Sequence, residues 1–269
     1  MFRGFKIKFN EKENIEFLST PYKKRYYNNK GRELFKAFQQ EIKYTINSFI
    51  LDDGTIDGSK MQENWFPQVE ADVFISHSHK DEEDAIAFAG WLYEKFNLIA
   101  FVDSCIWGYS DELLKNIDDL KCKNGNGNYD YDKRNRSTSI VHMILSTALT
   151  MMIDNTETIF LLNTNNAINT SSVISDTTNS PWLYSEITIS KLIQKKEPKR
   201  HYRRTVLFSK AILDSLNENV IAKFEVDTEH LNSITEITLN KWVTECNLLH
   251  KKYQYSLDAL YYLRPPKKL

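Results

Sequence analysis

The chain has 269 residues, 41% apolar and 26% charged, which is enough to bury a sizeable core and argues against extended disorder. Its formal net charge of −1 gives no electrostatic case for nucleic acid as the main partner. No run of about 18 apolar residues occurs, so no membrane span is expected, and the first residues lack the apolar stretch of a secretion signal.

Residues 1–70 are expected to form an N-terminal extension that is partly helical. An amphipathic helix is predicted over residues 31–50, because apolar residues recur there at helical spacing, namely Phe35, Phe38, Ile42, Ile46, Phe49 and Ile50. Asp53-Gly54 and Asp57-Gly58 then mark turns. The apolar face of this helix has two open interpretations, which are packing against the next domain and binding of another protein.

From Ala71 onwards, short apolar runs alternate with helical patterns. Buried strands are predicted at 73–75, 99–102, 158–162, 205–208 and 222–226. Helices are predicted at 84–96, around 140–148, from Pro181 onwards and at 231–242. This alternation with fully apolar strands indicates an α/β fold, a doubly wound five-stranded parallel sheet of the flavodoxin type. We place this domain at residues 71–245 and expect a tail, residues 246–269, to pack on it.

Two long polar segments interrupt the alternation. Residues 121–137 are predicted to form an inserted loop inside one crossover, and their carboxylates are too irregular for a calcium loop. Residues 163–179 form a second polar stretch directly before the helix that starts at Pro181. Loops of this length are often functional, so each segment is either a functional loop, which for residues 121–137 could be a lid, or a tolerated surface loop.

In a doubly wound sheet, ligands bind beyond the carboxyl ends of the strands. Polar residues follow three of the predicted strands, beginning at Ser76, Asp103 and Asn163. The first of these loops is basic and lies near a helix N-terminus, which suits an anionic group and predicts a pocket for a phosphorylated ligand. Neither a dinucleotide fingerprint nor a P-loop motif occurs, and three scattered cysteines predict neither a zinc site nor a disulfide framework. Few cysteines fit a reducing, cytoplasmic setting.

The stretch SPWLYSEI starts a helix with Ser180 as N-cap and Pro181 in the first helical position. Trp182 begins the apolar side of this helix. Glu186, one turn beyond Trp182, falls in the middle of that side, where an apolar residue is expected. The carboxylate therefore either faces a pocket or forms a salt bridge at the helix edge.

Residues 71–107, ADVFISHSHK to FVDSCIW, resemble the opening of TIR (Toll/interleukin-1 receptor) domains. The shared pattern is a D-V-F-I-S strand, a polar loop, a helix, and a strand ending in F-V-D. TIR domains that cleave NAD⁺ also carry a Trp four residues before a catalytic Glu, just inside a helix, and Trp182 and Glu186 match that arrangement. The resemblance covers about residues 71–245. It departs from the family pattern in a longer crossover over residues 108–157 and in histidines where some relatives have arginines.

The resemblance implies that Glu186 is catalytic and that NAD⁺ is the substrate, with no cofactor and no metal. Candidate substrate contacts are the strand-end and helix residues Ser76, His77, Ser78, Lys80, Asp103, Trp107 and Trp182. For Asp103 a capping role stays open, and for Trp182 a role in the core. The family also implies TIR–TIR self-association and antiphage defence of the Thoeris type, in which an ADP-ribose-derived product reaches a separate effector. An NAD⁺-depleting hydrolase and a non-catalytic TIR scaffold are the alternatives.

Overall fold

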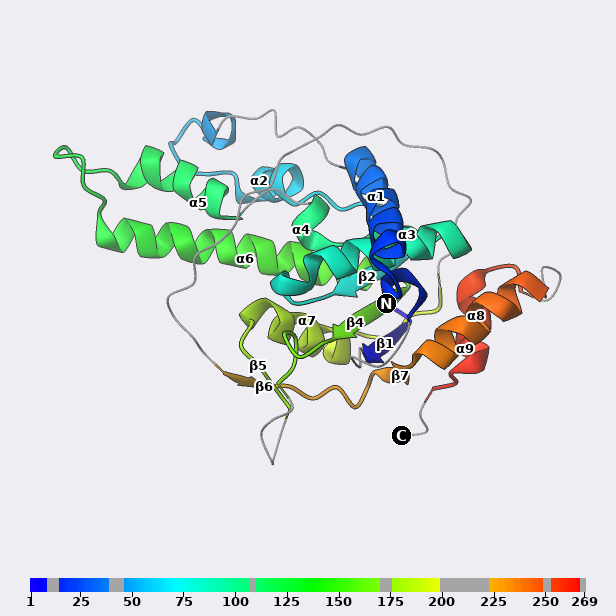
Figure 1. The fold of residues 1–269 in the computed structure, drawn as a ribbon. Helices are drawn as coiled ribbons and strands as arrows, with labels where there is room; N and C mark the ends of the chain where they lie inside the picture. The colour runs from blue at the N-terminus through cyan, green and yellow to red at the C-terminus, as the bar shows by residue number, and fades with distance from the viewer. Residues whose placement is uncertain are drawn as a thin grey trace.

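The computed structural model of this chain describes residues 1–8, 15–38, 46–106, 110–169, 176–198, 223–248 and 253–266. At its centre lies a five-stranded sheet with helices packed around it (Figure 1). The strand order is β3 (Ala100–Phe101), β2 (Val73–Ser76), β4 (Thr158–Asn163), β1 (Arg3–Lys8) and β7 (Asn232–Ile234), and every pairing is parallel. The predicted five-stranded parallel sheet is thus confirmed, and its flanking helices are compatible with a flavodoxin-like fold.

Two strands of the sheet come from segments that the sequence patterns assigned otherwise. β1, within the predicted N-terminal extension, lies between β4 and β7 and pairs with both. Phe5 and Ile7 of β1 are fully buried, but Lys6 alternates with them, so the segment lacks the continuous apolar run of a central strand. Lys6 leaves the core by extending to Thr228, with 2.8 Å between its Nζ and the hydroxyl. β7 occupies the start of the helix predicted at 231–242, and α8 (Glu236–Leu248) begins only after it.

The predicted last strand at 222–226 does not belong to the central sheet. β6 (Phe224–Glu225) pairs antiparallel with β5 (Thr177–Thr178) in a separate two-stranded ribbon. Lys223 and Glu225 are exposed, so this run suits a half-exposed ribbon rather than a buried strand. The strand predicted at 205–208 lies outside the described residues.

The remaining helices are α1 (Pro21–Phe38), α2 (Gly58–Trp65), α3 (Glu82–Phe96), α4 (Asp103–Ile106), α5 (Ser110–Ile117), α6 (Tyr131–Asn155), α7 (Pro181–Leu192) and α9 (Ser256–Leu263). Short 3-10 helices occupy Glu16–Leu18, Ile46–Phe49 and His79–Asp81, and a π-helical turn occupies Asp118–Cys122. The helix predicted over 31–50 is therefore only partly right, because α1 already starts at Pro21 and Ile46–Phe49 is 3-10 helix. Asp57 caps α2 through a 3.0 Å bond from the Lys60 amide rather than forming a turn.

The polar segment 121–137 is helical over much of its length. α6 begins at Tyr131, where the Asp130 side chain accepts a 3.0 Å hydrogen bond from the Lys133 amide. The predicted inserted loop is thus shorter than expected, because an N-cap lies inside it. α6 is the one described helix whose length and composition would allow it to cross a membrane, but its apolar face packs on α2 and α7 within the domain.

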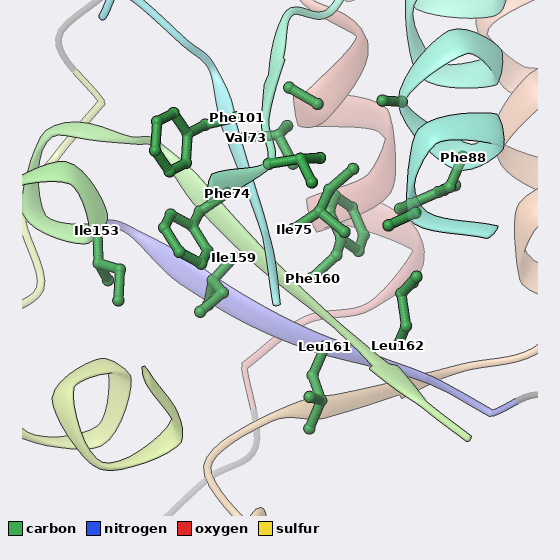
Figure 2. Close-up of a cluster of buried hydrophobic side chains, with 14 of the residues drawn as sticks. Val73, Phe74, Ile75, Phe88, Phe101, Ile153, Ile159, Phe160, Leu161 and Leu162 are labelled. Carbon is green, nitrogen blue, oxygen red and sulfur yellow. The ribbon is translucent and has the colours of Figure 1, made fainter. Parts of the chain in front are cut away.

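Alternating side chains divide the core between the two faces of the sheet (Figure 2). Phe74 and Ile159 point to the side that holds Ile153 of α6, whereas Phe160 points to Phe88 of α3 on the other side. Trp242 of α8 stacks on that second side, against Phe160, with a centroid separation of 6.3 Å. The alternation also directs the last residue of β2, Ser76, to the same side as Phe74. This is the side that α7 covers.

Candidate functional site

The helix α7 begins as its sequence predicts. The Ser180 side chain accepts a 3.3 Å hydrogen bond from the Leu183 amide, and Pro181 takes the first helical position. Trp182 is half-buried against the core, and its ring lies 5.6 Å from the ring of His142 on α6. One turn further on, Glu186 is only 4% exposed. The buried side of α7, which also holds Leu183, Ile187 and Ser190, therefore carries a carboxyl group into the interior.

Glu186 finds its partner at the carboxyl end of β2. The Ser76 hydroxyl donates a hydrogen bond to Oε2 of Glu186, and Ser76 itself is 1% exposed. The two residues are far apart in sequence and meet because β2 ends beneath α7. The carboxyl group is therefore held at the edge of the sheet where ligands of such folds bind.

The pKa of Glu186 is raised well above its ordinary value. Burial is the main cause, and the negative charge of Asp103, at the start of α4, raises it further, while the hydrogen bond from Ser76 acts in the opposite direction. The enclosed site thus favours the neutral carboxylic acid. A positive charge beside Glu186 would favour the carboxylate instead.

The structure brings Ser76, Glu186 and Asp103 together, whereas the other predicted contacts are more dispersed. Ser78 is buried, His77 is half-buried and Lys80 is exposed. The ring of His79, also exposed, lies 3.9 Å from a carboxylate oxygen of Glu82. Trp107 lies outside the described residues.

The first turn of α3 does not favour the predicted phosphate contact. It carries three carboxylates, Glu82, Glu83 and Asp84, which themselves stabilise the positive end of the helix dipole and repel an anion. β3 is followed almost directly by α4. Cys105 on α4 is buried, and burial raises the pKa of its thiol.

A second polar cluster at the same sheet edge had no signal in the sequence patterns. Asp81, at the end of the loop after β2, is buried and accepts hydrogen bonds from Thr164 and Asn166 in the loop after β4. An aspartate directly before a helix ordinarily suggests a cap. The Asp81 side chain makes no cap bond to α3, so only the folded structure shows its partners.

A cavity lies away from these residues. It has a volume of about 490 Å³ and sits at the C-terminal end of α3, facing the segments around Cys246 and Tyr253. Ser76 and Glu186 are not among its lining residues, so we assign the chemistry to the buried carboxyl group rather than to this cavity. In the described part of the chain, no group of three or more His, Cys, Asp or Glu side chains is placed to hold a metal ion.

Comparison of the chain with family models, with curated proteins and with solved structures found no match.

Proposed function

We propose that this chain cleaves NAD⁺ at the bond between nicotinamide and ribose, with Glu186 as the catalytic carboxylate. The observation that carries the proposal is the burial of Glu186 at the carboxyl edge of a parallel sheet, beside Ser76 and Asp103. The resemblance of residues 71–107 and of the Trp182–Glu186 pair to NAD⁺-cleaving TIR domains supplies the substrate.

The chemistry of NAD⁺ fits the electrostatics of this carboxyl group. The nicotinamide ring carries a positive charge, so its entry beside Glu186 would lower the pKa of the carboxyl and shift it to the ionised form. As the glycosidic bond breaks, its electron pair leaves with nicotinamide, which becomes neutral, and positive charge develops on the ribose. The carboxylate stabilises that oxocarbenium-like transition state. Because the leaving group is neutral, no proton donor is required. The anomeric carbon then forms a new bond to water, which loses a proton and gives ADP-ribose, or to a nucleophilic atom of the same molecule or of an added small molecule.

An alternative role for Glu186 is purely structural. A neutral carboxyl group bonded to Ser76 could join β2 to α7 in a TIR scaffold that only binds other TIR domains. The charge of Asp103 does not separate the two roles, because it favours the neutral carboxyl group that a scaffold would use. The effect of Glu186→Gln on NAD⁺ cleavage separates them.

The biological setting is proposed on the resemblance alone. We propose an antiphage enzyme whose ADP-ribose-derived product acts on a separate effector, with depletion of NAD⁺ as the alternative outcome. TIR domains of this type also complete their sites by self-association. Specific activity that rises with protein concentration would support self-association, and full activity of a monomer would exclude it.

The test is nicotinamide release from NAD⁺ by the purified chain, with product identification by mass spectrometry. Glu186→Gln removes the charge with little change of shape and should lower kcat by about 10²–10³, the effect of losing one transition-state electrostatic contact. Glu63→Gln, at an exposed carboxylate on α2, is the matched control and should be unaffected. An inactive wild type is assayed again with extract from phage-infected cells as trigger. Full activity of a folded Glu186→Gln protein would refute the catalytic role and favour the scaffold.

A further inference from the structure

A buried carboxylate outside the proposed catalytic group joins two loops at the carboxyl edge of the sheet. Asp81 is 6% exposed and uses both of its oxygens. Oδ1 accepts a 2.6 Å hydrogen bond from the Asn166 side-chain amide, and Oδ2 accepts one from the Thr164 hydroxyl. Asp81 belongs to the loop after β2, and both donors belong to the loop after β4. This carboxylate is therefore a cross-link between the two loops.

The hydrogen-bond directions show that the Thr164 hydroxyl donates its proton to Asp81. The Thr164 hydroxyl oxygen accepts hydrogen bonds from the amides of Asn166 and Ala167, at 3.2 and 3.1 Å. An amide cannot accept the hydroxyl proton, so that proton goes to Asp81. The single hydroxyl oxygen of Thr164 thus stabilises its own loop through two backbone amides and also bonds that loop to Asp81. On the other side, the Asp81 amide donates to the Ser78 carbonyl at 2.7 Å, which closes the loop after β2.

The two loops tied by Asp81 flank the place where Ser76 meets Glu186. Ser76 ends β2 and lies opposite Leu161 of β4 in the register of the sheet. The chain then enters the two loops, one from each of these neighbouring strands. Asp81 ties these two loops to each other just beyond Ser76.

We propose that Asp81 is a positioning residue for the Glu186 site, and this inference rests on the proposed NAD⁺ cleavage. Asp81 touches neither Glu186 nor, in the proposed reaction, the ribose. Asp81 acts by holding the loop that follows Ser76 at a fixed position relative to residues 163–168. Looser loops would misplace the ribose against Glu186, and misplacement at the reacting centre lowers kcat more than it raises KM.

The experiment compares Asp81→Ala, Asp81→Asn and Thr164→Val with two matched controls. Thr164→Ser keeps the hydroxyl, and Asp84→Ala removes a carboxylate from the first turn of α3 that pairs with Lys24 rather than with the loop after β4. Hydrogen exchange over residues 163–169 measures the cross-link, and NAD⁺ kinetics per folded molecule measure its consequence. If Asp81→Ala fails to fold, Asp81→Asn and Thr164→Val carry the same comparison.

Loss of hydrogen bonds to a charged group predicts about tenfold faster exchange and about tenfold lower kcat in Asp81→Ala and Thr164→Val, with KM changed less than about threefold. Asp81→Asn, which keeps an acceptor for Asn166, should fall between Asp81→Ala and the wild type. Both controls should match the wild type. Unchanged exchange, or faster exchange with unchanged kcat, overturns the positioning role. A wild type that releases no nicotinamide even with trigger refutes the proposed function itself, and the positioning role with it.

Discussion

Replacement of Gly90 by alanine tests the packing that anchors the N-terminal segment to the sheet. Gly90 lies in α3 where α1 crosses it. A methyl group at Gly90 would lie 1.9 Å from the carbonyl oxygen of Tyr27 and 2.7 Å from the amide nitrogen of Gly31, both on α1. Both obstacles are backbone atoms, so no side chain can rotate away. The two helices would have to move apart.

The size of the effect follows from these distances. Ordinary van der Waals contact begins at 3.4 Å, so the methyl group requires the helices to separate by about 1.5 Å. Overpacking typically costs about 1–3 kcal/mol, and the rigid backbone places this site at or above the upper end. The higher helix propensity of alanine offsets about 1 kcal/mol of this cost. A net loss of about 2 kcal/mol or more should lower Tm by about 4–8 °C in a domain of this size.

Thermal and urea unfolding, followed by circular dichroism, measure this change. Gly58→Ala is the matched control, because a methyl group in the first turn of α2 would meet only Ile144, at 3.8 Å, and its stability should be unchanged or slightly higher. A Gly90→Ala protein as stable as the wild type would mean that α1 does not cross α3 at this contact. The reasoning about the N-terminal segment would then fail.

Two further predictions concern pH. The raised pKa of Glu186 means that the folded state keeps a proton that the unfolded state releases, so this stability is full below the unfolded pKa of about 4.3 and is lost as pH rises through the folded pKa. Glu186→Gln should therefore become more stable than the wild type as pH rises above about 4.3. The same dependence of the free energy of unfolding on pH in both proteins, measured with urea, would contradict the burial of the carboxyl group. His230 shows the opposite dependence, because burial and the nearby lysines lower its pKa from 6.5 to about 4 although Asp227 raises it. The stability provided by neutral His230 is fully present above pH 6.5 and is lost as pH falls toward 4. Over this range His230→Gln should therefore lose about 1–2 kcal/mol less of its free energy of unfolding than the wild type, a value discounted for the partial exposure of the ring. An equal loss of stability at acid pH in His230→Gln and in the wild type would refute this prediction.

Local pattern alone determined the elements nearest to the proposed site. The apolar runs at 73–75, 99–102 and 158–162 became β2, β3 and β4, because continuous apolar β-branched and aromatic residues suit a strand buried on both faces. Ser180 and Pro181 began α7 where their capping chemistry requires. The phase of that helix also placed Glu186 inside, because one turn beyond Trp182 returns to the same side.

Tertiary structure decided which distant segments meet. β1 became a central strand because its backbone pairs with both β4 and β7 and the side chains of Phe5 and Ile7 are buried in the core. The Lys6 side chain bonds to Thr228, which is far away in the sequence. The ribbon of β5 and β6 likewise depends on a partner far along the chain. Sequence periodicity reports which face of an element is apolar, but not what packs against it. The bonds of Glu186 to Ser76 and of Asp81 to Thr164 therefore exist only once the sheet has set its strand order.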